Sequence, residues 1–209
     1  MEHIKLKTGA VDKNLFQLLE QLMISEELKH FYLVGGTALA LHLGHRKSID
    51  IDLFYHDHFD SALIASYLND TFEIKSIEVS KNLVRCFIDN IKIDIMSHRY
   101  PLVDDIMISN NLRIASLKDL AAMKLNAVTN RGMKKDFWDI GILLYIFSLN
   151  EMLTFYKAKY PEASLWQVEK SLTWFNDADT EQTEIIDLKG HHWPAIKQKI
   201  LKETKKLLK

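Results

Sequence analysis

Two aspartates and two glycines are the residues of this sequence whose types and spacing could do chemistry. Asp50 and Asp52 lie two positions apart in an alternating segment, so in a strand both carboxylates would lie on one face. Two carboxylates on one face repel each other unless a cation lies between them. Mg²⁺ binds one or two such carboxylates together with phosphate oxygens. The pair therefore predicts a magnesium site that acts on a phosphate-bearing substrate.

The glycine pair predicts a place for the phosphates of that substrate. Gly35 and Gly36 follow a short apolar run, 31–34, and a helical pattern begins at Thr37. The start of a helix presents unpaired backbone N–H groups and a partial positive charge. Glycine lets a phosphate approach the backbone closely. We expect the backbone of the two glycines and the hydroxyl of Thr37 to hold a triphosphate.

A third acidic residue, Asp94, lies in a later strand-like segment. Ile91, Ile93 and Ile95 alternate there on one face, which places Asp94 on the opposite, polar face. A carboxylate on a neighbouring strand would complete a two-metal site. We therefore predict Asp94 as the third metal ligand, with a possible second role as general base.

These residues need a small sheet to position them. Strands are expected at 31–34, 49–54, 72–79, 83–88 and 91–96, and helices at 12–28, 37–43 and 58–69. In the second strand Ile49, Ile51 and Leu53 should share one face, and Asp50, Asp52 and Phe54 the other. Asp89-Asn90 predicts a tight turn between the last two strands.

Helical patterns dominate after Pro101, and Ser116 is expected to cap the first helix. The expected helices cover 117–129, 134–148, 150–159, 164–175 and 192–208. The sequence thus predicts an α+β fold. A mixed sheet with flanking helices spans 1–105, and a helical C-terminal region, 106–209, completes the cleft.

The bulk composition is that of an ordinary globular protein. The 209 residues carry a net charge of −1, so no whole-surface attraction to nucleic acid is expected. One cysteine, Cys86, excludes an internal disulfide and fits a reducing compartment. The N-terminus opens into no apolar signal segment, and no apolar run approaches the ~18 residues of a membrane span. We expect a cytoplasmic protein without a membrane segment.

The order of these motifs is more specific than any one of them. A strand, Gly-Gly-Thr, a helix, Asp-x-Asp and a later lone strand aspartate resemble the nucleotidyltransferase superfamily to which DNA polymerase beta belongs. Within it, Gly-Gly-Thr-Ala-Leu-Ala-Leu followed by His-Arg-x-Ser-x-Asp-Ile-Asp-Leu-Phe resembles the AbiEii/AbiGii toxin family. The resemblance covers about residues 30–145.

A second block carries the same resemblance. It contains Lys124, Arg131 and then Lys135-Asp136-x-x-Asp139, in which the two aspartates share a helix face. One interpretation is that Lys124, Arg131, Lys135 and Asp136 line the cleft opposite the metal site, with Lys124 and Asp136 taking part in catalysis. The other is a salt-bridge network between helices. The residues alone leave both interpretations open.

The resemblance implies a nucleotidyltransferase-type sheet and an enzyme of the EC 2.7.7 type. Such an enzyme would move a nucleoside monophosphate from a nucleoside triphosphate to an acceptor hydroxyl, with one or two Mg²⁺ ions. The implied metal ligands are Asp50, Asp52 and Asp94. The implied nucleotide-binding residues are Gly35, Gly36, Thr37, Arg46, Ser48, Arg131 and Lys135.

The acceptor and the partners follow only from the resemblance. It implies RNA, with the tRNA end as the leading acceptor, and a toxin opposed by a cognate antitoxin. One alternative is a nucleotidyltransferase acting on a small molecule or a protein hydroxyl. The other is a catalytically silent member that binds a nucleotide or a partner protein.

Overall fold

The computed structural model describes residues 6–207. They form two compact units. Among the described residues, the sheet unit comprises 6–101 and Asp105–Ala115, and the helical unit comprises Leu102–Asp104 and 116–207. No helix within 6–207 is both long and apolar enough to cross a membrane. Residues 1–5, which the signal-peptide expectation concerned, lie outside the described residues.

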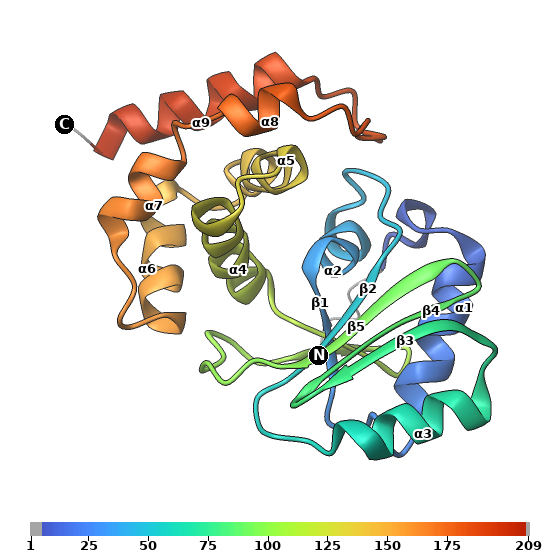
Figure 1. Ribbon diagram of the computed structural model, residues 1–209. Helices are drawn as coiled ribbons and strands as arrows, with labels where there is room; N and C mark the ends of the chain where they lie inside the picture. The colour runs from blue at the N-terminus through green and yellow to red at the C-terminus, as the bar shows by residue number, and fades with distance from the viewer. Residues whose placement is uncertain (1–5, 208–209) are drawn as a thin grey trace. The chain divides into compact units, whose positions relative to one another are not determined.

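The sheet unit contains one mixed seven-stranded sheet in the order β3-β4-β5-β2-β1-β7-β6 (Figure 1). Its strands are β1 (Tyr32–Val34), β2 (Ile51–Tyr55), β3 (Ile74–Ser80), β4 (Leu83–Ile88), β5 (Ile91–Ser97), β6 (Met107–Ser109) and β7 (Leu112–Ile114). β2 runs parallel to β5, and β1 runs parallel to β7. The other neighbouring pairs are antiparallel. The predicted α+β class with a mixed sheet is confirmed.

The helices of the sheet unit are α1 (Lys13–Ile24), α2 (Gly35–Leu43) and α3 (Ser61–Thr71), after a short 3-10 turn, Thr8–Ala10. α3 packs against β3 and β4, α1 against β7, and α2 against β1 and β2. The two central strands place Ile51, Leu53, Ile93 and Ile95 in the core with no exposed surface. Side chains alternate across a strand, so Asp52 and Asp94 lie on the other face. We call that other face the open face.

The predicted turn at Asp89-Asn90 is present and fixes the register of β4 against β5. Both residues have positive φ, +49° and +64°, as a two-residue hairpin turn with the matching twist requires. Ile88 pairs with Ile91, and three residues further along each strand Arg85 pairs with Asp94.

Two expectations for the sheet are wrong. Ile49 does not share the core face of β2, since it precedes the strand and is 73% exposed. The hairpin of β6 and β7 was not predicted, and it adds two strands from a stretch assigned to the helical region. Three-residue strands are too short to show a clear alternation.

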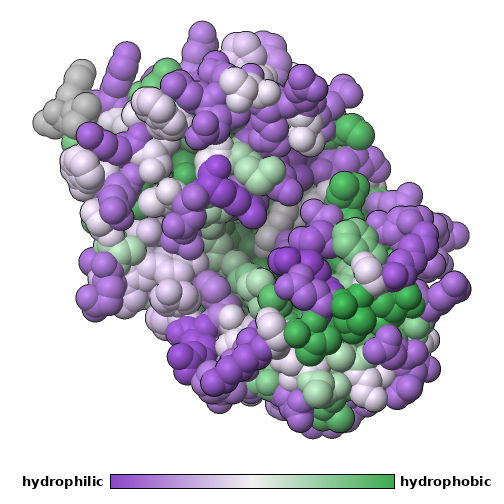
Figure 2. Space-filling model, viewed as in Figure 1, coloured by the Kyte–Doolittle hydropathy of each residue, from purple (hydrophilic) through white to green (hydrophobic). Residues whose placement is uncertain are grey.

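The edge of the sheet at β3 is only partly covered. Figure 2 shows hydrophobic residues gathered at the surface over β3 and β4. Val79 and Phe87 are the large apolar side chains of these strands that are clearly exposed. The edge strand β3 also carries charged residues, Lys75 and Glu78, which oppose pairing with a further strand.

The helical unit is built around α4 (Leu117–Asn130). Its other helices are α5 (Lys134–Leu143), α6 (Leu149–Lys159), α7 (Leu165–Ser171), α8 (Asn176–Thr180) and α9 (Trp193–Leu207). α4 packs against α5, α6 and α7, while α9 packs against α5 and α6. Ser116 caps α4 by accepting a hydrogen bond from the backbone N–H of Asp119, as expected. The short helix α8 was not predicted.

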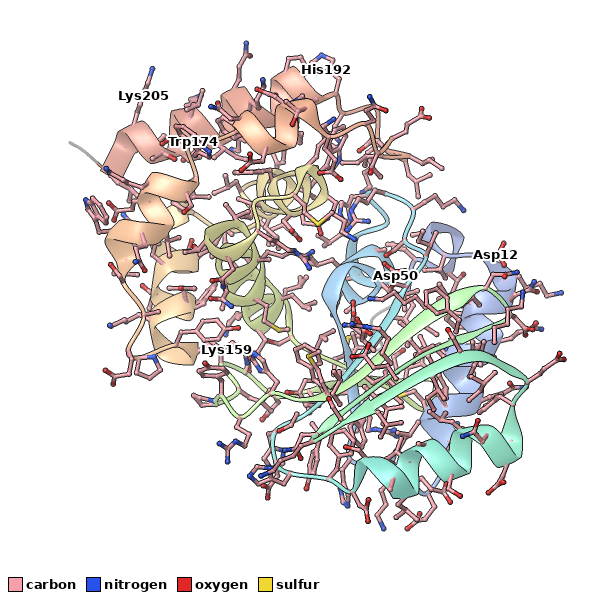
Figure 3. All side chains as sticks on the ribbon, viewed as in Figure 1. Asp12, Asp50, Lys159, Trp174, His192 and Lys205 are labelled. Atoms are coloured by element: carbon pink, nitrogen blue, oxygen red, sulfur yellow. The ribbon has the colours of Figure 1, made fainter. Side chains whose placement is uncertain are left out.

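A buried ion pair ties residues 102–104 to the helical unit. Lys159, at the end of α6 (Figure 3), lies 2.7 Å from the carboxylate of Asp119, and both side chains are 1% exposed. Asp119 also accepts hydrogen bonds from the backbone N–H groups of Val103 and Asp104. These contacts explain why this loop belongs to the helical unit although the strands on either side of it belong to the sheet.

Candidate active site

Gly35 turns the chain from β1 into α2 and lies directly against Asp52. Its φ is +73°, which is in the left-handed region where glycine has no steric cost. Val34 pairs with Asp52 across β1 and β2. A Cβ atom on Gly35 would lie 2.2 Å from Oδ2 of Asp52. Only glycine therefore allows this carboxylate to lie so close to the first turn of the helix.

Gly36 occupies a similarly crowded position on the other side of the turn. A Cβ atom there would lie 2.6 Å from Nη2 of Arg46 and 3.2 Å from Oγ of Ser48. Arg46 is buried, with 5% exposure, and its Nη1 donates to the carbonyl of Lys47. The structure thus brings Gly36, Arg46 and Ser48 together beside the helix start.

The hydroxyl of Thr37 holds the aspartate segment in place. It donates to the carbonyl of Asp50 and also lies 2.9 Å from the hydroxyl of Ser48. Thr37 and Ser48 are 1% and 8% exposed. Their side chains therefore connect α2 to the segment that leads into β2. Asp50 is half-buried and lies beside this first turn of α2 (Figure 3).

Asp52 and Asp94 are register partners on neighbouring strands. β2 and β5 run parallel, and Asp52 pairs with Asp94 directly across them. Paired residues of adjacent strands project from the same face of a sheet. Asp52 and Asp94 therefore lie side by side on the open face, next to the Gly35 turn. The sequence placed Asp94 on the polar face, and its strand position agrees.

Asp94 differs from the expectation in its surroundings. It is 7% exposed, and Arg85 Nε and Lys92 Nζ each lie 2.6 Å from its oxygens. Burial alone would raise the pKa of this carboxyl, but the hydrogen bonds and charges of Arg85 and Lys92 outweigh burial and lower it. Asp94 is therefore ionised at neutral pH and is already neutralised by two cations.

The carboxylates provide hard oxygen ligands of the kind that Mg²⁺ prefers. Within residues 6–207, however, no three acidic, His or Cys side chains converge as a ready-made metal site. Asp52 lies in β2 and Asp50 directly precedes this strand, whereas Asp94 is bonded to Arg85 and Lys92. The chemistry of these carboxylates suits a divalent ion that is completed by substrate oxygens. Asp50, Asp52 and Asp94 as its ligands stay a prediction.

Arg85 and Lys92 are site residues that the sequence reasoning missed. A signal for Arg85 was present, because a two-residue turn at Asp89-Asn90 places it directly opposite Asp94. Lys92 is two residues before Asp94 on the same strand and therefore shares its face. The open face thus carries cations as well as carboxylates.

The second block forms a buried salt-bridge network between α4 and α5. Lys124 Nζ lies 2.9 Å from Asp136 and 2.7 Å from Asp139, and both aspartates are fully buried. Arg131 donates two hydrogen bonds to Asp136. Burial raises the pKa of Asp136, but Lys124 and Arg131 together lower it below its ordinary value. Lys135 is half-buried in the first turn of α5.

These contacts favour the salt-bridge interpretation of the block. Lys124 and Asp136 are bonded to each other in the interior of the helical unit, with exposures of 5% and 0%. Arg131 is the member that reaches the surface, with a side chain that is 53% exposed. A direct catalytic role for Lys124 and Asp136 stays a prediction.

Replacement of Gly35 by alanine should disrupt the site through the contact with Asp52. We expect Gly35→Ala to abolish nucleotidyl transfer and to lower stability by about 1–2 kcal/mol from the left-handed conformation alone. The Cβ would in addition displace the Asp52 carboxylate. The measurement is thermal unfolding by circular dichroism together with transfer of labelled nucleotide.

Gly190→Ala is the matched control for this change. Gly190 has a similar φ of +80°, but a Cβ atom there would meet nothing within 4 Å. Gly190→Ala should lower the stability through the strained backbone conformation alone and should transfer labelled nucleotide at the wild-type rate. Full activity in Gly35→Ala would show that the close approach of Gly35 to Asp52 is irrelevant to the reaction.

Known proteins resemble this chain over most of its length. The family described as nucleotidyl transferase AbiEii toxin, type IV toxin–antitoxin system, matches residues 17–207. An uncharacterised protein of Aquifex aeolicus (strain VF5), aq_aa25, is 33% identical over 198 residues, which cover 92% of this chain and 95% of that protein.

Two solved structures share the fold. MenT4, a nucleotidyltransferase toxin of Mycobacterium tuberculosis H37Rv, superposes with a TM-score of 0.60 at 12% identity, over 93% of this chain and 82% of that one. JHP933 of Helicobacter pylori superposes with a TM-score of 0.54 at 16% identity, over 95% of both chains. Together with the matched family, these findings confirm the predicted resemblance: the chain belongs to the AbiEii family of nucleotidyltransferase toxins and is a nucleotidyltransferase.

Proposed function

We propose that this enzyme transfers a nucleoside monophosphate from a nucleoside triphosphate to a hydroxyl of RNA, with the tRNA end as the leading acceptor. The observation that carries the proposal is the pairing of Asp52 with Asp94 beside the Gly35 turn. One place on the open face thereby combines a helix start for phosphates with carboxylates for a divalent ion.

The nucleotide would bind with its phosphates against the first turn of α2. The backbone N–H groups of Gly35 and Gly36 lie at the helix start and supply unpaired donors. Arg46 lies against Gly36 and adds positive charge. Asp50 and Asp52 would hold Mg²⁺, which when bound would neutralise the phosphates and stabilise the departing pyrophosphate.

Asp94 would serve the acceptor side of the reaction. Arg85 and Lys92 keep it ionised in the resting protein. Substrate phosphates attract the same two cations, so binding would loosen their hold on Asp94. The carboxylate would then be able to accept the proton of the attacking hydroxyl or to act as a ligand. This exchange of partners reconciles a general-base role with a lowered pKa.

The family description supports a toxin in a type IV toxin–antitoxin system, and with it a cognate antitoxin. We propose that modification of the acceptor RNA is the toxic event and that the enzyme acts in the cytoplasm. Regulated expression of the wild-type protein should arrest the growth of the host cells, and expression of the Asp52→Asn variant should not.

Transfer of label tests the proposed reaction. Purified protein is incubated with Mg²⁺, each α-³²P-labelled triphosphate in turn, and total RNA, total protein or a small-molecule extract. We expect label in RNA, concentrated in the tRNA fraction, and dependent on Mg²⁺. Label found only in protein or in small molecules would refute RNA as the acceptor. A failure to bind or transfer any triphosphate would refute the whole proposal.

A further inference from the structure

An aromatic shelf continues from the acidic pair along the open face of the sheet. Phe54 is two residues after Asp52, and Met96 is two residues after Asp94, so both share the face of the carboxylates. The ring of His98 stacks on Phe54 with a centroid distance of 4.9 Å and an interplanar angle of 26°. His98 also contacts the ring of Tyr100 at 4.9 Å.

The shelf starts close to the carboxylates and extends away from them. The rise of a strand places His98 about 13 Å from Asp94 along β5. A hydrogen bond from the backbone N–H of His98 to the carbonyl of Tyr55 keeps the chain in line beyond the end of the strand. The rings of Phe54, His98 and Tyr100 therefore form one continuous row from the reaction centre toward the surface.

A hollow of about 550 Å³ lies at the outer end of this row. Its volume is in the range of small-molecule sites and suits a nucleotide-sized group. Lys81 and Arg99 line it together with His98 and Tyr100, and none of its lining residues is acidic. Lys81 and Arg99 are exposed, and Nη1 of Arg99 is held 2.8 Å from the ring of His58.

This combination of rings and cations is suited to a single-stranded nucleic acid. Bases stack on aromatic side chains without regard to their identity, while cations contact the phosphates between them. The whole protein carries a net charge of −1, so a local cationic hollow without carboxylates is a distinct feature. A polyanion would be attracted to this place and not to the surface as a whole.

We propose that the shelf of Phe54, His98 and Tyr100, with the cations Lys81 and Arg99, binds the single-stranded end of the acceptor RNA and leads it to Asp94. The inference rests on the proposed function, because it assigns a binding place to the RNA acceptor of that reaction. It identifies residues that set the affinity for RNA but do not take part in the chemistry.

Binding without turnover tests the shelf independently of the reaction. A fluorescein-labelled 12-nucleotide single-stranded RNA is titrated with the full chain, without triphosphate or Mg²⁺, and anisotropy is recorded at several salt concentrations. We expect Tyr100→Leu to weaken binding about tenfold, because one stacked base is lost. The double variant Lys81→Gln/Arg99→Gln should reduce the salt slope by about 0.7 for each lost phosphate contact.

Two control variants lie on the same unit away from the shelf. Lys75→Gln changes an exposed lysine near the other end of β3, and Tyr67→Leu changes a ring on α3 that contacts Phe72. Both should bind RNA within about twofold of the wild-type protein. Circular dichroism melting of every variant ensures that a loss of affinity is not a loss of folding.

Steady-state transfer separates this inference from the proposed function. If the shelf is correct, Tyr100→Leu raises the KM for RNA and leaves the KM for the triphosphate unchanged. Wild-type RNA affinity in all shelf variants, with normal transfer, would overturn the shelf and leave the proposed function intact. A wild-type protein that binds the RNA through the shelf but transfers no nucleotide would instead refute the proposed function alone.

Discussion

Asp52→Asn should lower nucleotidyl transfer by at least about a thousandfold and leave the protein folded. A bound divalent ion contributes several kcal/mol to charge stabilisation in the transition state. Each 1.36 kcal/mol corresponds to a factor of ten in rate. Asparagine has nearly the same shape as aspartate, so the packing against Gly35 is retained. What is lost is the charge that holds the metal.

The melting temperature should change little. Asp94, the register partner of Asp52, repels its charge, whereas the nearby guanidinium of Arg85 attracts it. These two effects oppose each other, so the melting temperature of Asp52→Asn should stay close to that of the wild type while transfer is lost. A residue that served only the fold would show the reverse pattern, with a lower melting temperature and retained transfer.

The matched control is Asp70→Asn, which changes an exposed aspartate on α3 in the same unit. It should transfer label at the wild-type rate. Label transfer is measured at saturating Mg²⁺ and triphosphate, so that weaker binding does not imitate a loss of catalysis. Equal transfer by Asp52→Asn and the wild type would rule out the metal site at Asp50 and Asp52.

The site residues that could be predicted from the sequence belong to motifs whose members lie close together along the chain. Gly35 and Asp52 stand within twenty residues of each other, in motifs whose order is informative. The alternation of isoleucines in β5 placed Asp94 on the polar face without knowledge of its neighbours. Local periodicity therefore predicted which residues share a face. The resemblance to a family predicted the type of reaction and the roles of these residues.

Contacts between elements that are far apart in the sequence were not predictable in the same way. Lys159 and Asp119 are 40 residues apart and meet because α4 and α6 pack together. The hydrophobic pattern of each helix does not indicate which residue of the other helix it will contact. Ile49 was misplaced for a related reason, because alternation continues past the point where the pairing of β2 begins. Pairing in the sheet decides where a strand starts, and a single segment does not contain that information.

Lys124→Met should destabilise the helical unit by about 3–5 kcal/mol, since removal of one member of a buried ion pair leaves uncompensated charge. Asp136 and Asp139 would both lose the cation that lies within 3 Å of each. Native domains have total stabilities of roughly 5–15 kcal/mol, so this single change is a large fraction. Methionine keeps most of the lysine's length and apolar stem, so the effect isolates the charge.

Tryptophan fluorescence during urea unfolding measures this effect selectively. Trp138, Trp166, Trp174 and Trp193 are the only tryptophans of the chain, and all belong to the helical unit. The pKa of Asp136 is lower in the folded protein than in the unfolded chain. Its ion pairs therefore contribute fully to the free energy of unfolding above the ordinary pKa of an aspartate, and this contribution is lost as pH falls through the lower folded pKa. The free energies of unfolding of Lys124→Met and the wild type should be compared at pH 7, and their difference should become smaller below about pH 4.

The same variants decide between the structural and the catalytic interpretation of Lys124. In the double variant Lys124→Met/Asp139→Asn, one of the two buried charges left by the single change is removed, so part of the lost stability should return. If the lysine is structural, transfer of label should return with it. If Lys124→Met keeps its folding transition but loses transfer, and the double variant restores stability without activity, then Lys124 acts on the substrate itself. The buried position of its Nζ between Asp136 and Asp139 favours the first outcome.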